Sequence, residues 1–496
     1  MKKIYILSLF LSYFVGISQE NTSKDALRYA VDDITGTARF RSMSGAFGAV
    51  GGDLSSININ PAGSAIFSNN IASITASSFN IKNNSNYFGT KTKENYSVLD
   101  LNQIGAVLVF TDSNPENNWK KISVAINYEN ANNLDNRIFS AGTNPNNSIG
   151  NYFLNFAQGI PINVLENYSY SDLDFGGQQA YLGYNAYLFD LESPETYISN
   201  VPSGRYYQEN QIVSNGYNGK LSGNFATSYK NKLFLGVNLN AHFTDFTKRF
   251  SVFESNNNPI NDLPRSSIKH IRFDNELYTY GSGFSFNLGA ILQATKEFRI
   301  GLAYESPTWY NLNDELIQGI ESVSINNPDN NSNPKFYPDV LNIYPTYKLK
   351  TPEKWTVSGA YVFGNRGLIS ADISRKDYSN TKYKPTKYYD DLNIDMSQNL
   401  TQAIEVRLGG EYRIKQLSLR AGYRFEESPF KVDYAMGDLT GYSGGIGYNF
   451  GESKLDLAYS NSHRNYNQSF VSSGMNDTAR IRTIQNNVTL TYSINF

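Results

Sequence analysis

Segments in which apolar and polar residues alternate recur from Ile71 to the C-terminus, and they constrain the fold more than any other feature. In the last segment the apolar set is Val488, Leu490, Tyr492, Ile494 and Phe496. Successive side chains of a β-strand point to opposite faces, so each segment predicts a strand with one apolar and one polar face. Segments of about ten residues with this pattern are typical of transmembrane β-barrels. A periplasmic β-sandwich or propeller is the alternative, although the propeller's blade repeat of about 40 to 50 residues is absent.

The N-terminus predicts export from the cytoplasm. Met1-Lys2-Lys3 is followed by an apolar run from Ile4 to Val15 and by the small residues Gly16-Ile17-Ser18, so residues 1–18 read as a signal peptide. This run is shorter than the roughly 20 apolar residues that a membrane-spanning helix needs. No other stretch of the sequence is long and apolar enough. Membrane insertion would therefore require a closed barrel.

The connections between the predicted strands differ in length. Alternate links are tight, as at Lys230-Asn231 and Gly451-Glu452, and the links between them are long and polar. The long links are residues 133–217, 312–341 and 379–400. Short turns on one side and long loops on the other are typical of outer-membrane barrels, with the turns in the periplasm and the loops outside the cell.

Composition excludes several other classes of protein. The sequence has no cysteine, which excludes disulfides and thiolate metal sites, and its net charge of −2 offers no basic patch for nucleic acid. The three histidines, His242, His270 and His463, are far apart in sequence. We therefore expect no metal, no cofactor and no catalytic residues.

Four loop carboxylates form two pairs that are close in sequence. A divalent cation site or an acid–base pair is one interpretation of them, and solvated loop positions are the more ordinary one. These residues are Asp172, Asp174, Asp390 and Asp391.

The stretch from Gly36 to Ser64 is unlike a strand, because it is dense in glycine and other small residues. Its features are Gly45, Gly48, Gly51, Gly52 and Asp53, followed by the turn Asn60-Pro61-Ala62-Gly63. A phosphate-binding loop would need a strand before it, a helix after it and a nearby lysine, and no lysine lies between Lys24 and Lys82. The composition favours a compact segment packed inside something larger.

Taken in order, these residues resemble the N-terminal hatch of the FadL/OmpP1/TodX family of outer-membrane transport proteins, in its Bacteroidetes-type form. The resemblance begins with Thr37-Ala38-Arg39-Phe40, continues through the glycine run and the Asn60 turn, and extends from about Ala26 to Phe496. Weaker similarities follow in order at 350–355, 377–379, 419–423 and 428–429.

The resemblance implies an all-β, antiparallel transmembrane barrel of about 14 strands in the outer membrane of a Gram-negative cell. A break at Thr351-Pro352 would raise the count to 15. Residues 19–70 would form a hatch inside the lumen of a barrel made by residues 71–496. The hatch residues would be Gly45, Gly48, Gly51, Gly52, Asp53, Asn60, Pro61 and Ala62.

The function implied by the resemblance is passive uptake of hydrophobic compounds such as long-chain fatty acids. Two short amphipathic helices expected within 133–217 would then frame a hydrophobic groove in which the ligand lands. Packing of their apolar faces on each other and on the barrel rim is the alternative. The candidate groove residues are Ile149, Phe153, Phe156, Leu182, Leu188 and Phe189.

Partners follow from the same reasoning. Hydrophobic small molecules and outer-membrane lipid are expected, and Tyr492 and Phe496 on the terminal strand look like the signal that the barrel assembly machinery reads. The alternative function is a barrel that transports nothing and serves as a subunit or shuttle of an outer-membrane secretion or assembly complex, bound to other outer-membrane proteins. Haem uptake is disfavoured because the histidines are not clustered.

Overall fold

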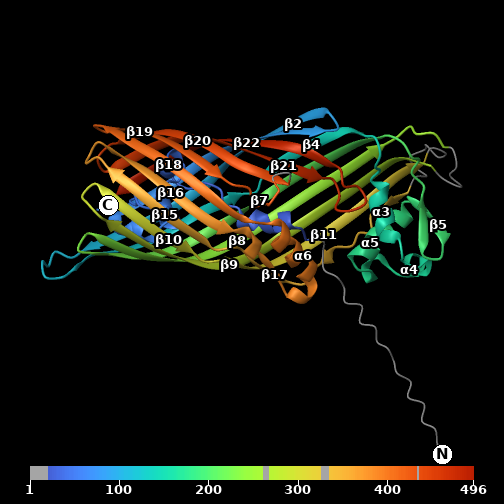
Figure 1. Cartoon of the computed structure of the whole chain (residues 1–496), viewed down its shortest axis with the longest axis horizontal. Coiled ribbons are helices and arrows are strands. Elements are labelled where there is room, and N and C mark those ends of the chain that lie inside the picture. The colour runs from blue at the N-terminus through green and yellow to red at the C-terminus, as the bar shows by residue number, and fades with distance from the viewer. Residues whose placement is uncertain (1–20, 261–266, 325–333, 433–434) are drawn as a thin grey trace, which may run out of the picture.

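The computed structural model describes residues 21–260, 267–324, 334–432 and 435–496, and these ranges form a closed antiparallel β-barrel (Figure 1). The expected signal peptide, residues 1–18, lies outside them. The wall runs in chain order and closes where β1 pairs with β22. Its first half comprises β1 (Ile71–Tyr87), β2 (Thr90–Thr111), β3 (Trp119–Asn133) continued by β4 (Asn136–Asn144), β7 (Tyr206–Tyr229), β8 (Leu233–Ser255), β9 (Ile268–Gln293) and β10 (Phe298–Glu305) continued by β11 (Trp309–Ser324).

The second half of the wall completes 14 strand positions, which confirms the predicted fold class. It comprises β14 (Tyr347–Lys350) continued by β15 (Lys354–Val362), β16 (Gly367–Asp377), β18 (Gln402–Ile414), β19 (Leu417–Glu426), β20 (Met436–Asn449), β21 (Ser453–Ser469) and β22 (Thr478–Asn495). The pairing of β1 with β22 closes the described strands into a ring, so that the backbone groups of the membrane-spanning part are paired, as hydrocarbon requires.

Two neighbouring wall positions are interrupted at a proline. Strand structure is interrupted at residues 306–308, between β10 and β11, and at residues 351–353, between β14 and β15. The two breaks lie side by side, because the Thr351 amide donates to the Thr308 carbonyl at 3.0 Å. Since β14 and β15 pair with β11 and β10 in the same order, the break at Thr351-Pro352 divides one wall position and does not add a fifteenth.

The height of the wall is uneven around the barrel. β7, β8 and β9 are 24, 23 and 26 residues long, whereas β15, β16 and β19 are 9, 11 and 10. A tilted strand crosses the membrane in about 9–11 residues. On β8 the outward face is apolar up to Phe243, and beyond it an exposed ion pair joins Arg249 and Glu276. The long strands therefore project well outside the membrane, at the end of the barrel where residues 150–185 form helices (Figure 1).

Strand pairing extends further than the sequence indicated. β4 and the start of β7 lie within the range expected to be a loop, 133–217, and β11 occupies half of the range 312–341. These stretches lie outside the membrane, where both faces of a strand can be polar. The alternation of apolar and polar residues that identifies a membrane strand is therefore weak there. The expected loop 379–400 contains β17 (Lys382–Lys384) and α6 (Thr386–Asn399).

The first long loop folds into a small domain at the extracellular end. It contains α3 (Gly150–Ala157), α4 (Ile162–Asn167), α5 (Phe175–Asn185), β5 (Phe189–Ser193) and β6 (Thr196–Ser199), and we call residues 145–205 the extracellular domain. The short strands β12 (Lys335–Phe336) and β13 (Asn342–Ile343) pair with β11 nearby.

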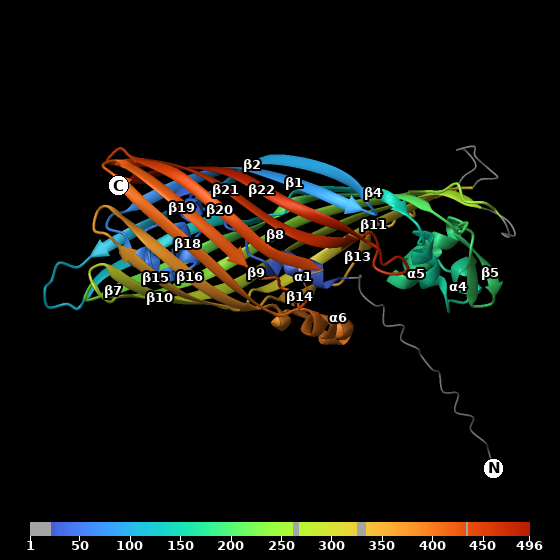
Figure 2. The ribbon, with the colours of Figure 1, turned by 45° about the horizontal axis from the view of Figure 1, so that its top comes forward.

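Residues 21–70, which we call the luminal segment, lie inside the barrel (Figure 2). The segment contains α1 (Ser23–Ala30), α2 (Ala38–Ser42) and the 3-10 turns Ser55–Asn58 and Pro61–Ile66. Helices long and apolar enough to cross a membrane are absent from the ranges that the structure describes.

The C-terminal Phe496 gives a first prediction. It is 63 % exposed, and its amide donates to the carbonyl of Asn70 at the seam of the barrel. If the terminal aromatic is the assembly signal, F496S should lower the yield of folded barrel in the outer membrane several-fold, measured by the heat-dependent shift of the barrel on a gel. F450S is the matched control, because Phe450 is equally exposed beside a periplasmic turn but is not terminal. Equal yields for the two variants would contradict the assembly role.

Candidate functional site

The luminal segment touches strands on several sides of the barrel. The Ala38 amide donates to Thr491 Oγ1 on β22 at 2.7 Å, and the Gly48 amide donates to a carboxylate oxygen of Asp372 on β16 at 3.0 Å. On a third side, Asn224 Nδ2 on β7 donates to the Pro61 carbonyl at 3.0 Å. The segment therefore spans the lumen, with hydrogen bonds to the wall on three sides.

Close approach to neighbouring atoms, either in the wall or within the segment itself, explains the glycines of this segment. A Cβ on Gly48 would lie 2.0 Å from Ser358 Oγ, which is closer than any real contact. Gly51 is at φ +62°, in the left-handed region that favours glycine, and its Cβ would collide with Gly63. Gly45 and Gly52 also have positive φ, and Gly45 packs against Phe40.

The Asn60 turn packs against the wall where glycine leaves room for it. Asn60 Oδ1 accepts from the Ala62 amide, and its Nδ2 donates to the carbonyls of Gly48 at 2.8 Å and of Ala290 on β9 at 3.1 Å. Ala62 is fully buried, and Pro61 occupies the first position of the turn. On the wall, a Cβ on Gly289 would lie 2.0 Å from Asn60 Oδ1.

Asp53 organises the centre of the segment. Its carboxylate accepts from Thr37 Oγ1 at 2.8 Å and from the Ser55 amide at 2.9 Å, and the side chain is buried. The two hydrogen bonds hold the start of α2 beside the 3-10 turn that follows Asp53. The eight residues proposed as a hatch thus lie in one connected structure. Asp53, Gly51 and Gly52 contact other parts of the segment, whereas Gly48 and the Asn60 turn contact the wall.

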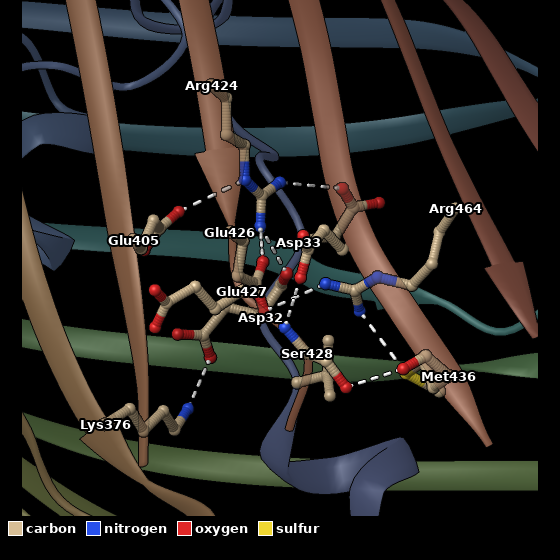
Figure 3. Close-up of polar contacts among 12 residues, drawn as sticks. Asp32, Asp33, Lys376, Glu405, Arg424, Glu426, Glu427, Ser428, Met436 and Arg464 are labelled. Atoms are coloured by element: carbon tan, nitrogen blue, oxygen red, sulfur yellow. Dashed lines mark hydrogen bonds and ion pairs between the residues drawn. The ribbon is translucent and has the colours of Figure 1, made fainter. Parts of the chain in front are cut away.

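An ionic cluster that the sequence did not reveal ties the segment to the wall near α1 (Figure 3). Asp32 lies 2.7 Å from Lys354 Nζ and 3.1 Å from Lys376 Nζ. Arg424 donates to the Asp32 carbonyl at 2.9 Å. Burial alone would raise the pKa of Asp32, but the two ammonium groups hold that pKa well below its ordinary value. We call these four residues the Asp32 latch.

A second ionic cluster lies toward the periplasmic turns. Glu411 accepts from Arg39 of the luminal segment at 2.9 Å and from Arg420 at 2.7 Å, and Arg413 also contacts it. The cluster borders a cavity of about 420 Å³ that also reaches Lys415 and Gln416 in the β18–β19 turn. The luminal segment is therefore held by charges at two levels of the barrel.

The lumen itself is strongly polar at the level of the segment. Inward-facing amides and hydroxyls on β7, β8 and β9 bond to each other and to the segment, as when Asn238 Nδ2 donates to the Ile57 carbonyl at 2.7 Å. His242 belongs to this set, with Nε2 2.9 Å from Ser285 Oγ. Inward residues of this kind are Asn224, Asn238, Asn240, Ser285 and Asn287.

The candidate groove residues form the interior of the extracellular domain. Ile149, Phe153, Leu182, Leu188 and Phe189 are buried, and Phe156 is half-buried. Leu188 and Phe189 lie outside the helices, because α5 ends at Asn185 and Tyr187, at φ +55°, reverses the chain. In this conformation the apolar faces of the helices pack on each other, which is the alternative to an open ligand groove.

This apolar interior continues into the barrel mouth. Phe153 and Tyr152 of α3 contact Phe273 of β9, with ring centroids 5.0 and 5.8 Å apart. Half-buried side chains at the edge of the same cluster, among them Phe156 and Phe336, connect it to the outer surface. Packed apolar side chains thus extend continuously from the extracellular surface to the barrel mouth, and we call this set of side chains the apolar path.

The other polar candidates do not form a reactive site. Asp174 caps α5 by accepting from the Gly177 amide at 2.8 Å, and Asp172, Asp390 and Asp391 are exposed. His270 stacks on Phe253. Across the described ranges no group of three or more metal-binding side chains occurs.

Comparisons with known proteins agree with this architecture. A family profile described as outer membrane protein transport protein (OMPP1/FadL/TodX) matches residues 204–495, more than half of the chain. No curated protein matches the sequence.

Two solved structures share the fold at low sequence identity. A FadL homologue of Pseudomonas aeruginosa is 14% identical and aligns over 94% of this chain and 100% of its own, with a TM-score of 0.52. The toluene transporter TodX of Pseudomonas putida is also 14% identical and aligns over 93% and 99%, with a TM-score of 0.51. At this identity the similarity establishes the fold and leaves the ligand open.

The fit between the Asn60 turn and the wall gives a second prediction. G289A places a methyl group against Asn60 and should destabilise docking of the luminal segment by about 1–3 kcal/mol, the usual cost of overpacking. Limited proteolysis of the segment in the folded barrel measures the effect. G223A is the control, since the nearest atom to a Cβ there is 4.0 Å away. Identical protection in the two variants would show that the close fit does not hold the segment.

The Asp32 latch gives a third prediction. D32N leaves Lys354 and Lys376 without their shared partner and should weaken docking by about 1–3 kcal/mol, after allowance for the partial exposure of Asp32. Because the pKa of Asp32 is depressed in the folded state, its contribution persists above pH about 4 and is lost only as the pH falls further. Ion conductance across a planar bilayer should rise in D32N at pH 7. A conductance equal to that of D245N, which changes an exposed carboxylate outside the lumen, would contradict the latch.

Proposed function

Since this chain belongs to the outer membrane protein transport protein family (OMPP1/FadL/TodX), we propose that it is a channel for the passive uptake of hydrophobic compounds. It is an outer-membrane β-barrel of a Gram-negative cell. Members of the family are transport channels, and we extend that role to this chain as a protein without catalytic activity. The observation that carries the proposal is the apolar path from the extracellular domain into a barrel closed by a hydrogen-bonded internal segment.

Capture is the first step of the proposed route. A hydrophobic ligand would enter the apolar interior of the extracellular domain at its half-buried edge, near Phe156 and Phe336, by displacing contacts between the helices. Burial of apolar surface provides the driving force. Ile149, Phe153, Leu182, Leu188 and Phe189 would then line the occupied state, as the groove hypothesis requires.

Release is the second step, and it requires movement of the luminal segment. The segment occupies the polar lumen below the apolar path, so residues 21–70 act as a hatch in this proposal. Its wall contacts are many but individually modest, because a typical hydrogen bond contributes about 0.5–1.5 kcal/mol net. A shift of the Asn60 turn away from β9 would open a passage without unfolding the wall.

Long-chain fatty acids are the ligand class that we propose. The apolar interior extends from α4 through α3 to Phe273 of β9, and its continuity would suit a long apolar chain. Its structural relative TodX is a toluene transporter, so small aromatic hydrocarbons are the competing ligand class. Uptake of labelled oleate and labelled toluene by the same cells distinguishes them.

A barrel subunit of a secretion or assembly complex is the second candidate function. The polar lumen favours it, because the segment that fills the lumen is hydrogen-bonded on several sides, as a permanent seal would be. Such a barrel would need a protein partner on its extracellular domain or loops.

The natural absence of cysteine allows a direct test of hatch movement. Ser44 Oγ of the segment lies 2.8 Å from Ser443 Oγ on β20, so S44C/S443C should form a disulfide that fixes the hatch to the wall. In a Gram-negative host lacking its own fatty-acid channel, oxidation should reduce oleate uptake several-fold, and a thiol reductant should restore it.

The matched control joins two wall strands. Ser85 Oγ of β1 lies 2.6 Å from Ser140 Oγ of β4, and S85C/S140C introduces a disulfide without touching the hatch. Oleate uptake through this variant should not respond to oxidation. If S44C/S443C also transports equally in both redox states, the hatch does not gate uptake.

A further inference from the structure

Four lysines face each other across two paired strands outside the membrane belt. β14 and β17 are antiparallel, with Lys348 opposite Lys384 and Lys350 opposite Lys382. The intervening residues Leu349 and Tyr383 are buried inward, so the lysines project from the outer face of the wall. In Figure 2, β14 lies beside α6 at the low side of the barrel. We call these four residues the lysine ladder.

Like charges directly opposite each other on paired strands are destabilising. Other lysines of the same region are neutralised within the protein: Lys354 and Lys376 point inward and share Asp32. Within the ranges that the structure describes, no carboxylate lies within ion-pair distance of any lysine of the ladder. The four ammonium groups of the ladder therefore face solvent and are available to an anion from outside the chain.

The ladder lies directly above the apolar belt. Trp309 pairs with Lys350 across β11 and β14, and Trp355 pairs with Arg375 across β15 and β16. Both tryptophans are nearly half exposed on the outer face, at 44 % and 48 %. Tryptophan in this position marks the boundary between hydrocarbon and headgroups. The ladder and Arg375 are thus at the level of the lipid headgroups on the extracellular side.

We propose that the lysine ladder, together with Arg375, binds the phosphate groups of a glycolipid in the outer leaflet. Lysine ammonium groups bind phosphate as compact charges, and clusters of four or more basic residues beside a membrane attract anionic headgroups. The adjoining exposed tryptophans would contact the acyl chains of the same lipid. This arrangement of charge above and apolar surface below matches a phosphorylated lipid better than it matches an acidic protein segment, which would need no apolar neighbour.

The test compares two variants that remove the same charge. K348Q/K350Q/K382Q/K384Q removes the ladder, and K230Q/K232Q/K296Q/K415Q removes four exposed lysines from the periplasmic turns. Both proteins are purified in mild detergent, checked for the folded barrel by heat-dependent gel mobility, and titrated with phosphorylated lipid A under native mass spectrometry. The ladder variant should bind at least about tenfold more weakly than the wild type, which corresponds to about 1.4 kcal/mol. The control should bind as the wild type does.

The chemistry of the lipid provides the second arm. Lipid A without its phosphates should bind the wild type as weakly as phosphorylated lipid A binds the ladder variant, and added salt should weaken only the phosphorylated form. Equal binding of phosphorylated lipid A to the ladder variant and the wild type would overturn the proposal. The proposal would also be overturned if dephosphorylated lipid A bound the wild type as tightly as phosphorylated lipid A does. Displacement of the lipid from the ladder by an acidic peptide at equal concentration would overturn it as well.

Discussion

Every backbone N–H and C=O group that lies in the hydrocarbon of the membrane needs a hydrogen-bond partner within the protein, and the rest of this structure depends on that requirement. It forces the wall to close, and closure depends on a single pairing of distant chain ends, β1 with β22. A closed wall of 14 positions encloses a lumen whose inward faces are polar, and those faces need partners as well. The luminal segment supplies many of them, as when Asn238 Nδ2 donates to the Ile57 carbonyl, and water can supply the others.

A filled lumen and a transport function place opposite demands on the segment. Small residues bring its backbone against the wall at Gly48, Gly289 and the Asn60 turn, where a single methyl group would collide. Such contacts give a precise resting position, and apolar clusters between the segment and the wall reinforce it. Charges at the Asp32 latch and around Glu411 hold the segment at two levels. A shift of the segment therefore has to break apolar as well as polar contacts, and water can replace only the lost hydrogen bonds.

The sequence predicted those parts of the fold that a local pattern encodes. The alternation of apolar and polar residues around Val488 and Tyr492 identified membrane strands. The Asn60 turn was predictable because proline and glycine restrict or relax the local backbone conformation. Helical spacing found the extracellular helices but not the direction in which Phe153 faces, because packing between helices is a tertiary property. The Asp32 latch was beyond prediction, since Asp32 and Lys354 are separated by more than 300 residues with no motif at either end.

Native mass spectrometry of the barrel, purified from its own membrane in mild detergent, tests the transport claim most directly. The account predicts a lone barrel that retains fatty acids or similar apolar molecules, and loses them when Phe153 and Phe273 are replaced by serine in a barrel that remains folded. An empty barrel in a stable, stoichiometric complex with other outer-membrane proteins would contradict the transport account and establish the assembly role in its place.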